Sequence, residues 1–217
     1  IGSQITESAP YLEAMDRVLD LVTQIEAAGI PIHHIDFGGG LGIDYNGDTP
    51  PAADVLWQQL LGKLDARGFG NRKIMIEPGR SLVGNAGVCL TEVLFLKPGE
   101  QKNFCIVDAA MNDLPRPALY QAYHAIVPLG EAPHGEARTW EVVGPVCESG
   151  DWIGHDRSLA VQQGDRLAVM SAGAYCMSMA SNYNSRPRAA EVMVSGASAR
   201  LVRQRESLAG LTTGEIV

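Results

Sequence analysis

Long stretches with a helical period alternate with short apolar runs in the first part of the chain. Over residues 11–28 apolar side chains recur every three or four positions, which predicts an amphipathic helix ended by Gly29. A second helix is expected over residues 54–67, with its leucines on one side. Short strands are expected at residues 34–37 and 73–77, and the apolar start of the second predicts a buried strand.

Helices between short strands favour right-handed βαβ units and a parallel sheet. We also interpret Ile1-Gly2-Ser3-Gln4 as the end of a strand that runs into a loop. Three successive strand ends then carry glycine and polar residues, at positions 2–4, 38–40 and 77–80. Because the carboxyl ends of parallel strands meet at one edge, we expect a single site there.

The pattern changes in the middle of the chain, where short β-like runs follow one another between Gly, Pro and Asp turns. These runs cover residues 88–96, 104–108, 122–127, 140–143, 167–170 and 191–195. A helical period recurs only at residues 173–181 and near the end of the chain. We therefore expect an α/β domain over residues 1–83 and a mainly antiparallel β domain over residues 84–217.

Composition narrows the classes of function. A net charge of −8 over 217 residues argues against a surface for nucleic acid or anionic membrane. No apolar run reaches the ~18–20 residues of a membrane span. The four cysteines form no CxxC pair and the five histidines show no ligand spacing, so we expect no metal site and reduced thiols in a cytoplasmic protein.

Two strand ends of the first domain offer candidate chemistry. Glu77-Pro78-Gly79-Arg80 is either a turn with two solvated charges, or a carboxylate for a cationic ring nitrogen beside an arginine for a carboxylate or phosphate. Gly38-Gly39-Gly40 is either a plain turn or a set of backbone N–H groups for a phosphate. A dinucleotide-binding motif would need glycine at Ile43, and the lysine of a P-loop is absent.

The second domain offers weaker candidates. Arg116 lies between two prolines with Tyr120 four residues on, in either a solvated loop or a site. Isolated cysteines are mostly inert, but Cys147 next to Glu148 in a glycine-rich turn is a candidate for proton transfer. Tyr175 is either a core or rim residue or part of a site.

Together and in this order, these segments resemble the fold-type III pyridoxal-phosphate decarboxylases, most closely their diaminopimelate branch of lysine biosynthesis. The resemblance covers nearly the whole chain and rests on residues 2–4, 36–42, 77–80, 112–120, 144–149, 173–175 and 183–187. It implies that residues 1–83 are the last part of a (β/α)8 TIM-like barrel, followed by an antiparallel β domain, in a homodimer with shared active sites.

The resemblance also implies a role for each candidate residue. The phosphate of pyridoxal 5'-phosphate would be held by Ser3, Gly38, Gly39, Gly40, Gly79 and Tyr175. Glu77 would keep the cofactor's ring nitrogen protonated, and Cys147 would lie near the reacting carbon, donated across the dimer interface. The remaining substrate-binding residues would be Arg80, Arg116 and Tyr120 for the distal carboxylate of meso-diaminopimelate, Glu148 for its distal ammonium, and Tyr175.

Two family residues have no counterpart, the histidine that stacks on the cofactor ring and the Schiff-base lysine. The four lysines, at positions 63, 73, 97 and 102, lie on a helix surface, before a strand or beside a turn. We therefore expect residues 1–217 to belong to a longer protein and not to catalyse turnover alone. Open alternatives are a decarboxylase for ornithine, arginine or carboxynorspermidine, or a non-catalytic homologue that binds a partner decarboxylase. Two arginines and a tyrosine favour a substrate with a second carboxylate.

Overall fold

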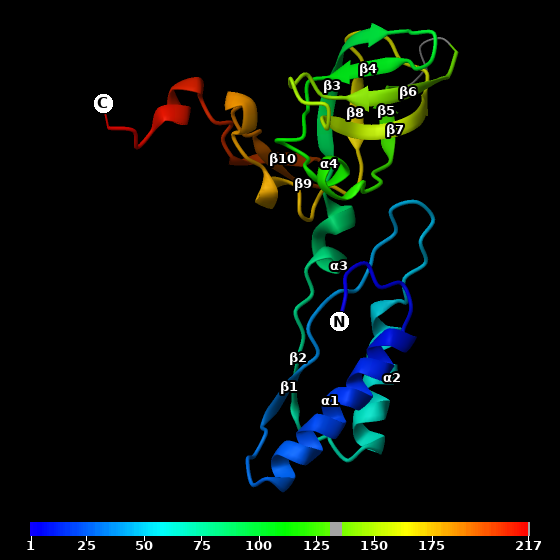
Figure 1. Cartoon of the computed structure of the whole chain (residues 1–217), viewed down its shortest axis with the longest axis vertical. Helices are drawn as coiled ribbons and strands as arrows, with labels where there is room; N and C mark the ends of the chain where they lie inside the picture. The colour runs from blue at the N-terminus through cyan, green and yellow to red at the C-terminus, as the bar shows by residue number, and fades with distance from the viewer. Residues whose placement is uncertain (131–135, 217) are drawn as a thin grey trace. The chain divides into compact units, whose positions relative to one another are not determined.

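The computed structural model describes residues 1–130 and 136–216 and divides the chain into two units, Ile1–Ala86 and Gly87–Val217. Figure 1 shows the elements of both units, and each unit is described by itself. Five histidines occur in the sequence, and His134 lies outside the described residues.

The first unit contains two long helices and two short parallel strands. Its elements are α1 (Ala9–Ala27), β1 (His34–Asp36), α2 (Ala53–Ala66), β2 (Lys73–Met75), α3 (Arg80–Val83) and the 3-10 turn η1 (Gly84–Ala86). Helix α1 buries Met15 and Leu19, and α2 buries Leu60 and Leu64, in one apolar cluster. The predicted helices and the parallel pairing of β1 with β2 are confirmed.

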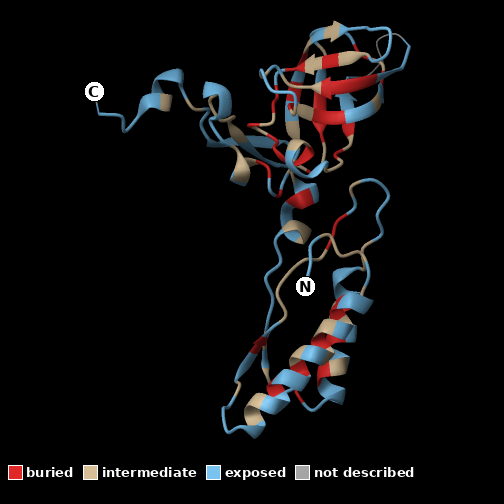
Figure 2. Cartoon of the chain, in the orientation of Figure 1, coloured by how far each residue is buried: buried red, intermediate tan, exposed pale blue. Residues whose placement is uncertain are grey.

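Two expectations for this unit are wrong. Residues 1–4 form no strand, and the nearest pairing is an isolated parallel bridge between Ile5 and Leu41. The second strand is not buried, because Met75 and Ile76 are 40% and 41% exposed. Ile74 packs against the helices. The strands β1 and β2 form a sheet of only two strands, and much of this part of the unit is exposed in Figure 2. The described residues of this unit form no closed barrel.

The second unit is built on a six-stranded sheet in the order β5-β8-β3-β4-β6-β7. The strands are β3 (Cys89–Lys97), β4 (Phe104–Val107), β5 (Ile126–Leu129), β6 (Arg138–Val143), β7 (Trp152–Leu159) and β8 (Arg166–Val169). Only β4 and β6 pair in parallel among these strands. A separate hairpin is formed by β9 (Glu191–Ser195) and β10 (Ser198–Arg203).

The second unit also contains short helical elements. They are the helix α4 (Arg116–Tyr120) and the 3-10 turns η2 (Met177–Met179), η3 (Tyr183–Ser185) and η4 (Leu208–Thr212). The helix expected over residues 173–181 is therefore reduced to a single 3-10 turn. The run at 122–127 was placed too early, since β5 begins at Ile126.

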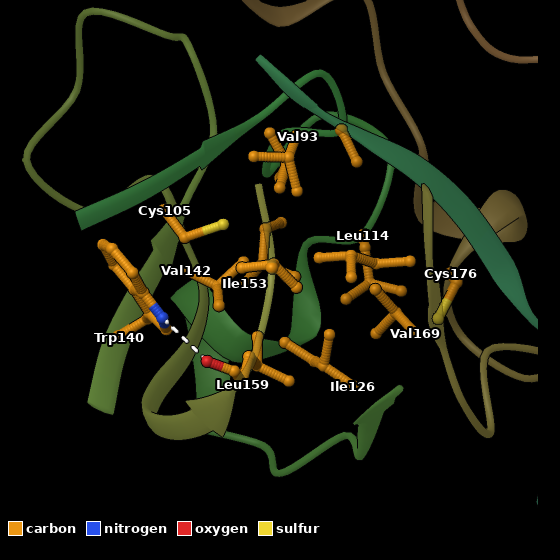
Figure 3. Close-up of a cluster of buried hydrophobic side chains, with 14 residues drawn as sticks. Val93, Cys105, Leu114, Ile126, Trp140, Val142, Ile153, Leu159, Val169 and Cys176 are labelled. Carbon is orange, nitrogen blue, oxygen red and sulfur yellow. Dashed lines mark hydrogen bonds between the residues drawn. The ribbon is translucent and has the colours of Figure 1, made fainter. Parts of the chain in front are cut away.

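The sheet curls around one apolar core, drawn in Figure 3. Val93, Val142 and Ile153 are fully buried in it. Trp140 lies at its edge, where its indole Nε1–H donates a 3.1 Å hydrogen bond to the carbonyl oxygen of Leu159. Such a bond removes the cost of burying the one polar group of the indole. The mainly antiparallel β unit is thus confirmed as the frame for the loops described next.

Candidate functional site

The glycine loop after β1 packs directly on the chain that leaves β2. The N–H of Glu77 donates a 2.8 Å hydrogen bond to the carbonyl oxygen of Gly38. A Cβ on Gly39 would lie 2.1 Å from the carbonyl oxygen of Glu77, which leaves no room for any side chain. Gly38 and Gly40 have φ of +70° and +98°, a region that favours glycine. Close backbone approach therefore requires glycine at positions 39 and 40, and a positive φ favours it at 38.

The same loop offers groups that suit an anion. Within the described residues, the N–H groups of Gly39 and Gly40 donate no hydrogen bond. Glu77 is exposed, and a Cβ on Gly38 would lie 4.0 Å from its Oε2. Backbone N–H donors and a solvated carboxylate thus lie side by side, an arrangement that suits a molecule with both a phosphate and a cationic nitrogen.

Arg80, at the start of α3, joins three segments of the first unit. Its Nη2 donates to the Ser3 hydroxyl at 2.9 Å and its Nη1 donates to the Tyr45 hydroxyl at 2.6 Å. The guanidinium also lies 5.5 Å from the centre of the Tyr45 ring. The structure thus brings Ser3 and Arg80 together, although residues 1–4 form no strand.

The Gln4 side chain forms hydrogen bonds with the backbone of Ile43, close to this cluster. Its side-chain Nε2 donates to the carbonyl oxygen of Ile43 at 2.6 Å, and its Oε1 accepts the N–H of Ile43 at 3.2 Å. These two hydrogen bonds connect the first residues of the chain to the segment that follows the glycines. The sequence assigned no role to Tyr45 or to Gln4, because partners 35 and 39 residues apart leave no spacing signal.

In the second unit, Arg116 and Tyr120 occupy the two ends of α4. Arg116 is buried, and its Nη1 lies 2.9 Å from Nε2 of the fully buried His124. Tyr120 is 62% exposed. The two predicted carboxylate-binding residues thus share one short helix but differ in burial. We assigned no role to His124 from the sequence, because a lone histidine has no pattern around it.

Cys147 and Glu148 lie in an exposed turn after β6. Glu148 Oε1 accepts the N–H of Gly150 at 3.2 Å, and its Oε2 accepts the hydroxyl of Tyr183 at 3.0 Å. These two bonds, the one from Gly150 first, lower the pKa of the Glu148 carboxyl. The carboxylate in turn raises the pKa of Tyr183. Glu148 is therefore held as an anion and Tyr183 as a neutral donor.

Asp151 fastens this turn to the loop after β4. Its Oδ1 accepts the N–H of Met111 at 2.7 Å and its Oδ2 accepts the N–H of Val146 at 2.9 Å. Burial raises the pKa of the Asp151 carboxyl, and the two N–H donors oppose that rise. Asp151 thus links the Cys147 turn to the segment that leads to Arg116.

Tyr175 is 42% exposed and has φ of +58°, a left-handed conformation that is uncommon for tyrosine. Its neighbours Ala174 and Cys176 are buried, so the strained backbone turns the tyrosine outward between two core residues. Its expected role at a phosphate stays a prediction.

Metal and membrane sites were not expected from the sequence. No group of three potential metal ligands occurs among residues 1–130 and 136–216. No described helix has the length and the apolar character needed to cross a bilayer. The four cysteines, all within the described residues, are free thiols.

Comparison with known proteins places these features in one family. The family model for the pyridoxal-dependent decarboxylase C-terminal sheet domain matches residues 14–173. Diaminopimelate decarboxylase from Vibrio cholerae is 52% identical over all of this chain, which covers 51% of that protein. The Pseudomonas aeruginosa protein of the same name is 50% identical over 99% of the chain and 51% of its own length.

Solved structures agree with the sequence relatives. Diaminopimelate decarboxylase from M. jannaschii, in co-complex with L-lysine, has a TM-score of 0.94 and 38% identity. The similarity covers all of this chain and 50% of that one. The Aquifex aeolicus protein AQ1208 has a TM-score of 0.90 and 46% identity over 98% of this chain and 52% of its own. The chain therefore spans about half the length of the relatives that it matches.

Proposed function

This chain belongs to the pyridoxal-dependent decarboxylase family, and from that membership we propose that the whole protein decarboxylates meso-diaminopimelate to L-lysine. The observation that supports this most directly is the pairing of the exposed Glu77 carboxylate with the glycine loop at residues 38–40. The diaminopimelate decarboxylases of Vibrio cholerae and Pseudomonas aeruginosa, with about half of their residues identical to this chain, support it independently.

The residues present fit pyridoxal 5'-phosphate. The N–H groups of Gly39 and Gly40 and the hydroxyl of Ser3 would bind its phosphate, together with Gly79 and Tyr175. Glu77 would hold a proton at the ring nitrogen, since a carboxylate stabilises a neighbouring cation. When bound, the cofactor supplies the electron sink for the pair of electrons left as CO2 departs.

The substrate is proposed from its charges. Arg80 and Arg116 carry guanidinium groups that suit a carboxylate, and Tyr120 adds an exposed hydroxyl four residues after Arg116. Glu148, held as an anion, would bind the distal ammonium. Ornithine and the other simple diamine precursors lack the second carboxylate and would leave the arginines without an anion.

The wider architecture is proposed from surfaces that this chain leaves uncovered. Residues 1–83 would be the last part of a (β/α)8 barrel, with the exposed Met75 and Ile76 covered by its other strands. An apolar cavity of about 440 Å³ beside Phe37 and Trp57 would be covered in the same way. The β domain that follows would supply Cys147 across a homodimer interface, in a cytoplasmic enzyme with free thiols.

The test is CO2 release by the full-length protein loaded with pyridoxal 5'-phosphate. We expect release from meso-diaminopimelate, and little from ornithine, arginine or carboxynorspermidine. Glu77→Ala should lower kcat far more than it lowers cofactor content, because the phosphate-binding loop remains. If CO2 is released from one of the other compounds but not from meso-diaminopimelate, the proposed substrate is refuted. If CO2 is released from none of the four, a non-catalytic binding protein is favoured.

A further inference from the structure

His124 contacts Met170, Arg157 and Arg116 at the place where the chain turns from α4 into β5. Its ring Nδ1 lies 2.8 Å from the carbonyl oxygen of Met170, and its own carbonyl oxygen accepts a 3.2 Å hydrogen bond from Arg157. The next residue, Ala125, accepts the N–H of Met170 at 2.8 Å. His124 is thus fixed through both its backbone and its imidazole ring, and it has no exposed surface.

These contacts determine which ring nitrogen carries the proton. A carbonyl oxygen can only accept, so the nitrogen that faces Met170, Nδ1, is the one that bears hydrogen. Nε2 faces Nη1 of Arg116 at 2.9 Å, and a guanidinium can only donate. Both contacts are satisfied together only by a neutral ring with hydrogen on Nδ1 and a lone pair on Nε2.

A neutral acceptor fixes an arginine in a different way from a carboxylate. The His124 imidazole orients the guanidinium and brings no negative charge of its own. The positive charge of Arg116 acts on the buried Cys176 thiol, whose pKa burial raises to about 11 and Arg116 partly lowers. The Arg116 guanidinium thus lies beside an imidazole that orients it, and its charge also acts on a buried thiol.

We propose that His124 is a positioning residue that directs the Arg116 guanidinium toward the substrate carboxylate far from the reacting carbon. This inference rests on the proposed function, in which Arg116 binds that carboxylate. It predicts that His124 affects the affinity for ligands that contain the carboxylate and not the affinity for ligands that lack it. L-Lysine retains this carboxylate after decarboxylation, whereas the diamine cadaverine does not.

The experiment compares His124→Phe and His124→Gln in the full-length holoenzyme. The phenyl ring is a planar, slightly larger ring that removes the acceptor, whereas the glutamine oxygen can still accept from Arg116. We expect His124→Phe to lower the affinity for L-lysine, measured by calorimetry, by about tenfold. This is the scale of one hydrogen bond to a charged group. Cadaverine binding should stay unchanged, KM for meso-diaminopimelate should rise more than kcat falls, and His124→Gln should recover most of the loss.

A double-mutant cycle with Arg116→Ala tests whether His124 acts through Arg116. Once the guanidinium is gone, His124→Phe should add less than about a twofold change in L-lysine binding. If Arg116→Ala weakens the binding of L-lysine and His124→Phe does not, the positioning role is overturned while the proposed function stands. Equal weakening of L-lysine and cadaverine would also overturn it. A wild-type enzyme inactive on meso-diaminopimelate would instead refute the proposed function.

Should His124→Phe fail to fold, the wild-type protein itself gives the answer. Neutron diffraction from crystals grown in D2O locates the exchangeable deuterons on the imidazole. A deuteron on Nδ1 and none on Nε2 is the expected result. A deuteron on Nε2 would overturn the proposal, because that nitrogen could then not accept from Arg116.

Discussion

The hydroxyl of Tyr183 donates a 3.0 Å hydrogen bond to Oε2 of Glu148, across 35 residues of sequence. The bond lowers the pKa of the carboxyl and raises the pKa of the phenol. It is therefore formed throughout the interval between those two pKa values, where Glu148 is charged and Tyr183 is protonated. Neutral pH falls within that interval.

Removing the Tyr183 hydroxyl should raise the pKa of Glu148. In Tyr183→Phe the carboxyl loses one of its two main donors, but the N–H of Gly150 remains, so the pKa should stay below the ordinary value. Titration of glutamate carboxyls labelled with 13C measures the change. Tyr120→Phe, which removes another exposed hydroxyl of the same unit, is the control and should leave Glu148 unmoved.

Gly39→Ala should destabilise the first unit. The new Cβ would lie 2.1 Å from the carbonyl oxygen of Glu77, so one of the two backbone segments must move. Overpacking of this kind costs about 1–3 kcal/mol. Gly62→Ala is the matched control, because Gly62 lies inside α2 with no atom near a new Cβ, and it should gain up to about 1 kcal/mol. Urea unfolding of the full-length protein measures both, and equal stability of the two variants would contradict the close contact.

Arg186→Ala should loosen the loop that leads to Arg116. Arg186 Nε donates to Oδ1 of the buried Asn112 at 2.9 Å, and its Nη2 donates to the carbonyl oxygen of Asp108 at 2.5 Å. The loss of hydrogen bonds from a charged donor predicts a cost of about 1.5–3 kcal/mol in unfolding free energy. Arg200→Ala, at an exposed arginine of β10 with no ion pair in the described chain, should change it by less than about 0.5 kcal/mol.

Long helices with a sustained apolar pattern were predictable from the sequence, and irregular strands were not. The two helices of the first unit are right to within two residues, because many side chains contribute to each pattern. Strand β7 was missed because its pairing with β6 is irregular, with register shifts around Val142, and Gly154 interrupts its alternation. Strand β10 was missed because all six of its residues are exposed, so no buried face marks it.

Chemistry at strand ends was also easier to predict than the contacts that orient it. Glu77 and the glycines stand beside recognisable strands, and their proximity follows from parallel pairing. Tyr45 and His124, the partners of Arg80 and Arg116, lie outside regular strands and helices, so these contacts depend on loop conformation. No local pattern encodes such a pairing, since a tyrosine in a loop or a histidine before a strand is common for many reasons.

The last prediction concerns acid and the β9–β10 hairpin. Glu206 Oε2 accepts the N–H of Arg188 at 2.9 Å and its Oε1 accepts Arg188 Nε at 2.7 Å, which joins the two ends of the hairpin. These bonds lower the pKa of Glu206 from 4.5 to about 2. A lowered pKa means that the stabilisation is complete above pH 4.5 and is lost as the pH falls toward 2. Acid should therefore open this hairpin from its base.

Hydrogen exchange at the Arg188 and Glu206 amides, corrected for the intrinsic effect of pH, measures that opening. Protection should stay constant from pH 7 to about 4.5 and then fall toward pH 2. Glu206→Gln should show lower protection at neutral pH and a flatter profile, because the amide does not titrate. Glu215→Gln, an exposed glutamate without an ion pair in the described chain, should keep the wild-type profile. A Glu206→Gln profile that still falls between pH 4.5 and 2 would mean that another acid controls the hairpin.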